Sequence, residues 1–228
     1  MRHSVFPGDT AIAAVSGWDG GSAYDIRLAA VLDQYGWKGT FFMQPETLGQ
    51  EGFLAENDLQ TIVGGGHEIG LFSPEWPHLV AQGPAACVHR LRAERTKLEA
   101  LIGKPVTSFA YPAGFMEDMA WIAEAVREAG FNSARTTQEA NLQASHITDW
   151  LRLPVTASAL HDHMGLRERW EAVEETGEGI FYLWGCSAEY GDDDDKWAEL
   201  ECNLAWFCGR LDVWYCTQAE LFAHLRNG

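Results

Sequence analysis

Short apolar runs alternate with segments of helical periodicity along the chain, and this alternation constrains the fold most. The runs predict strands, beginning with 11–15 (AIAAV) and 39–43 (GTFFM). The segment 24–35 between them has apolar residues at helical spacing and stops at Gly36, a residue that favours helix ends. Repeated strand–helix units with short connections imply a parallel sheet covered by helices.

The same pattern continues to the C-terminus. About seven or eight such units favour a closed barrel over an open sheet. No linker and no internal repeat interrupts the pattern, so we expect residues 1–228 to form a single domain. The further predicted strands are 67–71, 106–111, 131–135, 151–153, 179–183 and 213–216, and the further predicted helices are 57–63, 84–102, 118–129, 164–176, 196–208 and 218–225.

Charge and composition limit the kinds of partner and the cellular compartment that we expect for this protein. The net charge of −17 repels phosphates and anionic lipids, so we expect neither nucleic acid nor a membrane surface as a partner. The five cysteines are an odd number without disulfide spacing and are typical of free thiols in a reducing compartment. With no apolar segment long enough to cross a bilayer and no signal-peptide core, we expect a cytoplasmic protein, with homo-oligomerisation left open.

Functional residues of parallel α/β barrels lie where the strands end. The predicted strand ends in this chain are rich in aromatic side chains and poor in titratable groups. They carry Trp18, Asp19 and Gly20, then Phe72, Trp76 and His78, then Tyr111 and Pro112, and finally Trp184 and Cys186.

Six motifs then occur in a specific order: WDGG (18–21), YGWKGTFF (35–42), GHEIG (66–70), FAYPAG (109–114), FYLWGCS (181–187) and WYCTQAEL (214–221). This set resembles the polysaccharide deacetylase family, metal-dependent carbohydrate esterases that include chitin and peptidoglycan deacetylases. The resemblance implies a distorted (β/α) barrel with about seven parallel strands, in agreement with the pattern of repeated units. It also implies hydrolysis of carbon–nitrogen bonds, a divalent metal such as zinc, and a carbohydrate or acetylated sugar derivative as partner.

The metal ligands of that family are not found at the matching positions. The first motif of the family has two adjacent Asp residues, a general base and then a metal ligand, which align here with Asp19 and Gly20. In an alternative register, Trp18 takes the base position and Asp19 is the ligand. The other two ligands, normally histidines, align with Phe72 and Trp76, which offer no lone pair to a metal. We therefore expect no metal at this site.

Three residues are the catalytic candidates that the resemblance implies: Asp19 as base, Tyr111 through a backbone N–H facing the oxyanion, and Cys186 at the position of the general acid. A metal lowers the pKa of bound water by roughly 9 units, whereas a general base contributes only about 10²–10⁴ in rate. Asp19 alone therefore does not replace a metal. Cys186 is a poor acid toward an amine, and it is either a nucleophile or a small residue that fills space.

The aromatic strand ends suit stacking on sugar rings, with ordinary core packing as the alternative. Two other places in the chain are alternative positions for a metal ion: His161 with His163, and the acidic run 192–195. Two functions follow: a non-catalytic carbohydrate-binding protein, or a divergent metal-independent hydrolase acting on amide or ester bonds of acetylated sugars. The predicted substrate-binding residues are Trp18, Phe72, Trp76, His78, Pro112 and Trp184.

Overall fold

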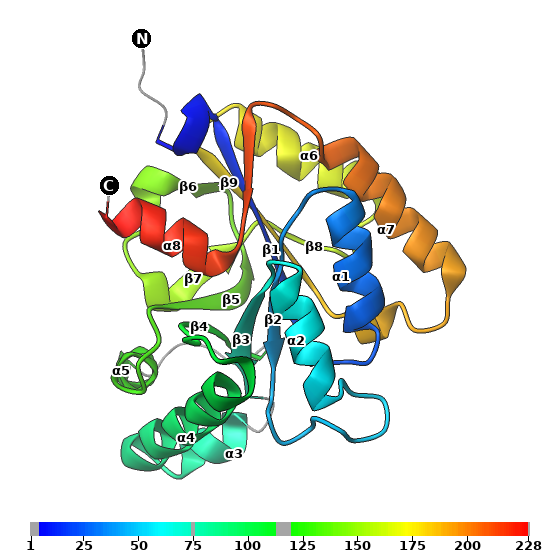
Figure 1. Cartoon of the computed structure of the whole chain (residues 1–228). Coiled ribbons are helices and arrows are strands. Elements are labelled where there is room, and N and C mark those ends of the chain that lie inside the picture. The colour runs from blue at the N-terminus through cyan, green and yellow to red at the C-terminus, as the bar shows by residue number, and fades with distance from the viewer. Residues whose placement is uncertain (1–4, 74–75, 113–119, 228) are drawn as a thin grey trace.

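A mostly parallel sheet curves around a central interior, and helices cover its outer face (Figure 1). The protein is described from a computed structural model, in which residues 5–73, 76–112 and 120–227 are described. Residues 113 and 114 of the FAYPAG motif and the first two residues of the predicted helix 118–129 lie outside this part of the chain.

The sheet returns on itself through one short segment. From β1 the order runs through β2, β3, β4 and β5 to β7 on one side, while β9 pairs with the other edge of β1. Only Thr156 separates β7 from β8, and β8 pairs with β9. The backbone N–H of Thr156 donates to the carbonyl of Tyr182 in β9 (2.8 Å). This nearly closed barrel confirms the expected fold. The strands are β1 (Ile12–Asp19), β2 (Thr40–Met43), β3 (Glu68–Phe72), β4 (Ser108–Ala110), β5 (Ser133–Glu139), β6 (Leu142–Gln143), β7 (Leu153–Val155), β8 (Ala157–Ser158), β9 (Gly179–Gly185) and β10 (Val213–Cys216).

The helices follow the strands nearly as the sequence predicts, with one addition. α3 forms in a segment that we treated as part of a strand-end loop, and it leads directly into the long α4 (Figure 1). No helix in the described part of the chain is long and apolar enough to span a membrane. The helices are α1 (Asp25–Gln34), α2 (Glu56–Gly64), α3 (Trp76–Ala81), α4 (Pro84–Ile102), α5 (Ala120–Glu128), α6 (His163–Glu174), α7 (Asp194–Phe207) and α8 (Gln218–Asn227).

The strand predictions need correction at several places. β1 and β5 each continue four residues beyond their predicted ends at residues 15 and 135, and the short β6 and β8 were not predicted. β7 begins where the predicted strand 151–153 ends, because Trp150–Arg152 form a 3-10 turn that is capped by the side chain of Asp149. The two residues of β6 pair with β9 in the antiparallel direction and carry no periodic signal.

Side chains alternate between the barrel interior and the helix layer. In β1, Ala13 and Val15 join an inner cluster with Tyr182, whereas Ala14 and Trp18 belong to the larger cluster beneath the helices. The interior is tightly filled next to Gly70, where an added Cβ would lie 2.4 Å from the ring of Phe42.

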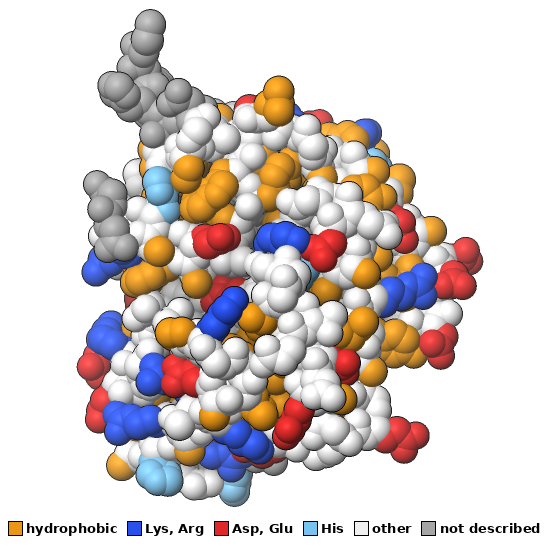
Figure 2. Space-filling model, viewed as in Figure 1, with side chains coloured by type: hydrophobic (Ala, Val, Ile, Leu, Met, Phe, Trp, Pro, Cys, Tyr) orange, Lys and Arg blue, Asp and Glu red, His pale blue; other side chains and the backbone are white. Residues whose placement is uncertain are grey.

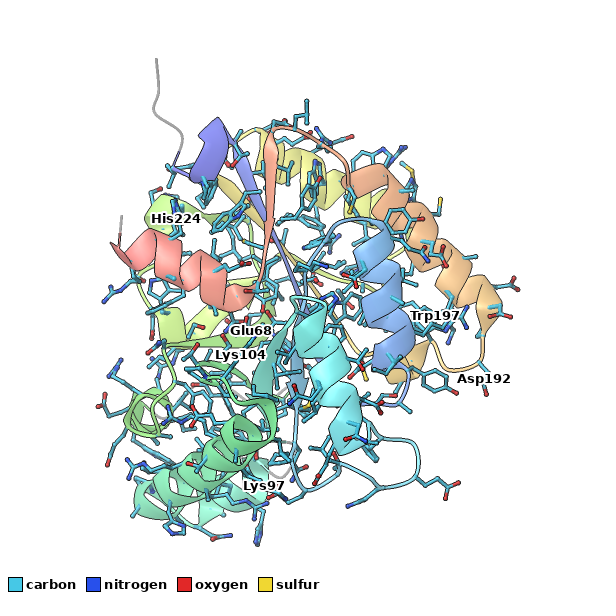
Figure 3. The ribbon with its side chains drawn as sticks, viewed as in Figure 1. Glu68, Lys97, Lys104, Asp192, Trp197 and His224 are labelled. Carbon is cyan, nitrogen blue, oxygen red and sulfur yellow. The ribbon has the colours of Figure 1, made fainter. Side chains whose placement is uncertain are left out.

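The first turn of α8 closes the end of the barrel where the strands begin. Gln218 is fully buried there, and its side chain donates to Ser133 (2.8 Å) and accepts from Tyr182 (2.5 Å). The buried carboxyl of Glu68 accepts from Thr40 (2.8 Å) and from the backbone N–H of Ala219 (2.9 Å). These polar contacts tie α8 to β2, β3, β5 and β9, and Figure 3 shows Glu68 beside the start of α8.

Candidate active site at the barrel mouth

A buried ion pair lies at the opposite end, where the strands finish. β1 ends at Asp19, and its carboxylate accepts a hydrogen bond from the guanidinium of Arg135 in β5. The Arg135 side chain is fully buried, and its guanidinium carbon lies 5.3 Å from the ring centroids of both Phe42 and Trp184. This placement gives the cation two aromatic faces in addition to its carboxylate partner.

Burial and the ion pair act on Asp19 in opposite directions. Burial is the larger effect and raises the pKa of Asp19, while the charge and hydrogen bond of Arg135 lower it. Since the carboxylate is engaged by a fixed cation, abstraction of a proton from water would disturb this pair.

A second buried carboxyl follows Asp19 after the glycine turn. Asp25 opens α1, is fully buried, and accepts a hydrogen bond from the hydroxyl of Ser187 (2.6 Å). Burial, with a smaller contribution from the charge of Asp19, raises the pKa of Asp25 to about 8, although the Ser187 bond opposes the shift. Asp25 is therefore mostly protonated at neutral pH, while its other carboxyl oxygen has no hydrogen-bond partner among the described residues.

Cys186 lies beside the glycine turn. A Cβ placed on Gly20 would be 3.6 Å from the sulfur of Cys186, so the thiol lies over the position where the family carries its second Asp. Burial raises the pKa of Cys186 to about 11, and the nearby Asp25 and Glu189 contribute in the same direction. The thiol is thus protonated at neutral pH and a weak nucleophile.

The residues at the family's metal-ligand positions do not fit a divalent metal. Gly20 has no side chain, Phe72 has no donor atom, and the indole N–H of Trp76 can only donate. Trp76 is also fully buried, with its ring 5.4 Å from that of Phe109 and 5.5 Å from that of Tyr111. No group of three or more His, Cys, Asp or Glu side chains able to hold a metal occurs among the described residues.

Five of the predicted substrate-binding residues fall into two sets. Trp18 and Trp76 are fully buried in the layer between barrel and helices, where Trp18 packs against Gly185. Phe72, Pro112 and Trp184 are partly exposed. Only the second set offers surface to a ligand in this structure.

The side chains of the remaining two candidates, Tyr111 and His78, make no hydrogen bond or salt bridge to the ion pair among the described residues. The Tyr111 backbone N–H donates to the carbonyl of Arg135 (3.0 Å), so the strand ladder uses the donor that we expected to face an oxyanion. The Tyr111 hydroxyl is buried without a hydrogen-bond partner in the described part of the chain, and burial raises its pKa. His78 is exposed on α3 and lines a cavity between α3 and α4.

The alternative metal positions are occupied by other contacts. His161 bonds Glu139 (2.6 Å), whereas His163 bonds Asn203, so the two imidazoles engage different partners. In the acidic run, Asp193 caps α7. Asp192 accepts from the hydroxyl of Tyr24 (2.8 Å) and lies at the edge of the molecule (Figure 3), and Asp194 pairs with Arg27 (2.9 Å).

Sequence reasoning missed Arg135, Asp25 and Ser187. Arg135 was detectable, because it is a cation within the short predicted strand 131–135 and needed a buried partner. Asp25 resembles an ordinary acidic residue at a helix start, and nothing in the sequence connects it to Ser187.

A family model for polysaccharide deacetylase matches residues 14–134, which is more than half of the chain and covers most of β1 and all of β2, β3 and β4. The chain belongs to the polysaccharide deacetylase family. A search of curated proteins found no match.

Solved structures share the deacetylase fold. A protein from Mycobacterium smegmatis assigned to the polysaccharide deacetylases has a TM-score of 0.77 at 18% identity, covering 97% of this chain and 92% of its own. A probable polysaccharide deacetylase from Pseudomonas aeruginosa has a TM-score of 0.76 at 15% identity, covering 100% and 95%. A CE4-family pseudoenzyme, in a mutant form with restored activity, has a TM-score of 0.56 at 13% identity, covering 95% and 69%. At these identities the likeness concerns the fold.

Proposed function

We propose that this deacetylase-family chain is a non-catalytic, cytoplasmic, carbohydrate-binding protein. The observation that carries the proposal is the Asp19–Arg135 ion pair, which engages the one carboxylate of the first motif with a protein cation. Gly20, Phe72 and Trp76 supply no metal-binding atom beside it. The five free cysteines support the location.

Two further features support loss of the family reaction. A metal activates water by lowering its pKa from about 15.7 to about 7, and no residue that the structure describes at the mouth supplies an equivalent effect. Cys186 stands at the position of the general acid, but its pKa of about 11 makes it a weak proton donor near neutral pH. The CE4 pseudoenzyme among similar folds offers an analogy for a family member without activity.

The partly exposed aromatics at the mouth support carbohydrate binding. Phe72 ends β3 and Trp184 lies near the end of β9, and both face the mouth in which Asp19 ends β1. Aromatic faces stack on the apolar faces of sugar rings, and the proposal assigns this role to Phe72 and Trp184.

Calorimetric titration with chitohexaose tests binding, and acetate release from the same oligosaccharide tests activity. We expect binding that is unchanged by EDTA, no acetate release, and weaker binding for Trp184→Ala. Trp121→Ala, a partly buried Trp on α5, is the matched control. Acetate release that EDTA abolishes, or an absence of binding to a broad panel of glycans, would contradict the proposal.

A second candidate, a metal-independent hydrolase, is favoured by one observation. Asp19 and Asp25 lie close enough to influence each other's ionisation, and Asp25 is mostly protonated near pH 7. Carboxyl pairs with separated pKa values act elsewhere as base and acid. Acetate release that persists in EDTA and is lost in both Asp19→Asn and Asp25→Asn would support this candidate.

A further inference from the structure

A cavity of about 250 Å³ opens between α3 and α4, beside the end of β3. Its polar lining residues are Ser73, His78, Gln82, His89 and Arg90. Ser73 directly follows Phe72, the last residue of β3, so the cavity begins at the rim of the barrel mouth. The cavity and the barrel mouth thus share this end of β3.

The cavity has an unusual charge for this protein. The whole chain carries a net charge of −17, yet no carboxylate occurs among the described residues that line the cavity. His78 and His89 are exposed and bring imidazole groups, and Arg90 brings a guanidinium that pairs with the buried Glu94.

A second cavity on the same helix shares His89 and adds a further guanidinium group. The polar residues that line it are His89, Arg92 and Glu128. Arg92 donates to the backbone carbonyl of Glu128 (2.8 Å), a neutral acceptor that leaves its charge uncompensated, and no ion pair to Arg92 occurs among the described residues.

The surface view shows the same asymmetry. Lys and Arg lie at the lower left over α4 and α5, interspersed with Asp and Glu and with His at the lower edge, whereas Asp and Glu outnumber Lys and Arg at the right-hand edge (Figure 2). The acidic edge includes Asp192, which lies across the molecule from Lys97 on α4 (Figure 3). An anionic ligand is therefore attracted to the α3–α4 face and repelled by the opposite edge.

We propose that the cavity between α3 and α4 binds an anionic substituent of a saccharide, so that the ligand of this protein is an acidic oligosaccharide. This inference rests on the carbohydrate-binding function proposed above. Imidazole and guanidinium N–H groups are hydrogen-bond donors that match carboxylate, sulfate or phosphate oxygens. The cavity is smaller than a usual small-molecule pocket of about 300–1,000 Å³ and fits one charged substituent or one sugar residue.

Calorimetric titration with two hexasaccharides of similar length tests the charge preference. A hyaluronan hexasaccharide alternates glucuronate with N-acetylglucosamine, whereas chitohexaose contains N-acetylglucosamine alone. We expect hyaluronan to bind about tenfold more tightly at low salt and to lose most of this advantage at about 0.5 M salt, where the Debye length is short. Inorganic phosphate should compete with hyaluronan and not with chitohexaose.

The variant His89→Gln tests whether the anionic group binds in the cavity. The matched control is His146→Gln, at an exposed histidine on another face of the protein. We expect His89→Gln to weaken hyaluronan binding about fivefold, which corresponds to the roughly 1 kcal/mol of one typical hydrogen bond, and to leave chitohexaose binding unchanged. Because His89 is exposed, the His89→Gln variant should unfold at the same temperature as the wild type.

Each failure has a different meaning. Equal affinity for the two hexasaccharides overturns the preference for an acidic ligand and leaves the carbohydrate-binding proposal standing. Binding of neither, together with no binding to the wider panel, overturns both proposals. Hyaluronan binding that is unaffected by His89→Gln, or by phosphate, overturns the assignment to this cavity.

Discussion

The hydroxyl of Ser187 lies 2.6 Å from a carboxyl oxygen of Asp25, and both side chains are buried. This contact joins the turn after β9 to the first residue of α1, next to the Asp19–Arg135 ion pair at the mouth. An exposed aspartate would be ionised at neutral pH, but burial keeps Asp25 largely protonated. Burial thus places a largely protonated carboxyl beside the Asp19–Arg135 ion pair at the mouth.

The first prediction concerns pH and stability. The pKa of Asp25 is about 8 in the folded protein and about 3.9 in an unfolded chain, so the folded state binds more protons between these values. The free energy of unfolding should therefore fall as pH rises from about 5 to about 8, by up to about 1.4 kcal/mol per pH unit through this residue. Urea unfolding across this range should show a shallower fall for Asp25→Asn, which mimics the protonated form.

Asp212→Asn, at an exposed carboxylate, is the control and should retain the wild-type pH dependence. The same dependence in wild type and Asp25→Asn would show that Asp25 is already ionised at neutral pH.

The second prediction concerns the ion pair. Arg135→Met leaves the Asp19 carboxylate buried without its cation and should lower the free energy of unfolding by about 3–5 kcal/mol at neutral pH. Asp19→Asn combined with Arg135→Met removes both charges and should recover part of this loss. Urea unfolding of the two single variants and the double variant measures the coupling. If the changes in unfolding free energy of the two single variants sum to that of the double variant, the interaction between Asp19 and Arg135 contributes nothing to stability.

The third prediction separates a nucleophilic Cys186 from one that fills space. Because its pKa is about 11 and the side chain is half-buried, iodoacetamide at neutral pH should modify Cys186 more slowly than the exposed Cys202. Mass spectrometry of tryptic peptides follows both sites, and Cys202→Ser removes the competing reaction. Faster labelling of Cys186 would favour the hydrolase alternative.

The fourth prediction compares two glycines. Gly70→Ala places a methyl group 2.4 Å from the Phe42 ring and 3.0 Å from the carbonyl of Ser108, so we expect a destabilisation of about 1–3 kcal/mol. Gly64→Ala lies at the end of α2 with no atom within 4 Å of the added carbon and should stabilise the protein by up to about 1 kcal/mol. Thermal unfolding measures both, and equal stability of the two variants would contradict the tight packing beside Phe42.

The sequence predicts the barrel well because its strands and most of its helices carry strong periodic patterns. The run 11–15 marks β1, and Gly36 and Gly103 follow α1 and α4 as the patterns require. The pattern fails at β6, which contains only two residues, and at α3, whose six residues were assigned to a loop. Short elements of this kind are set by their tertiary neighbours and not by local preference.

The site is predicted less completely than the fold. Position along the chain places Asp19 and Cys186 at strand ends, and the structure adds that the Cys186 thiol lies beside the glycine turn. Chain position does not show that Arg135 reaches Asp19, because that pairing depends on the separation of β1 and β5 within the curved sheet. Nor does it show which face Trp18 occupies, since the observed strand continues to residue 19 and alternation then turns Trp18 toward the helices.

The contacts of Gln218 give the C-terminal helix a role out of proportion to its length. A truncation before residue 218 would remove the helix turn that closes this end of the barrel and would let water reach Ser133, Tyr182 and Glu68. Shortened forms of the protein that end before α8 should therefore aggregate on expression, whereas a tag attached after α8 leaves the barrel closed by this helix.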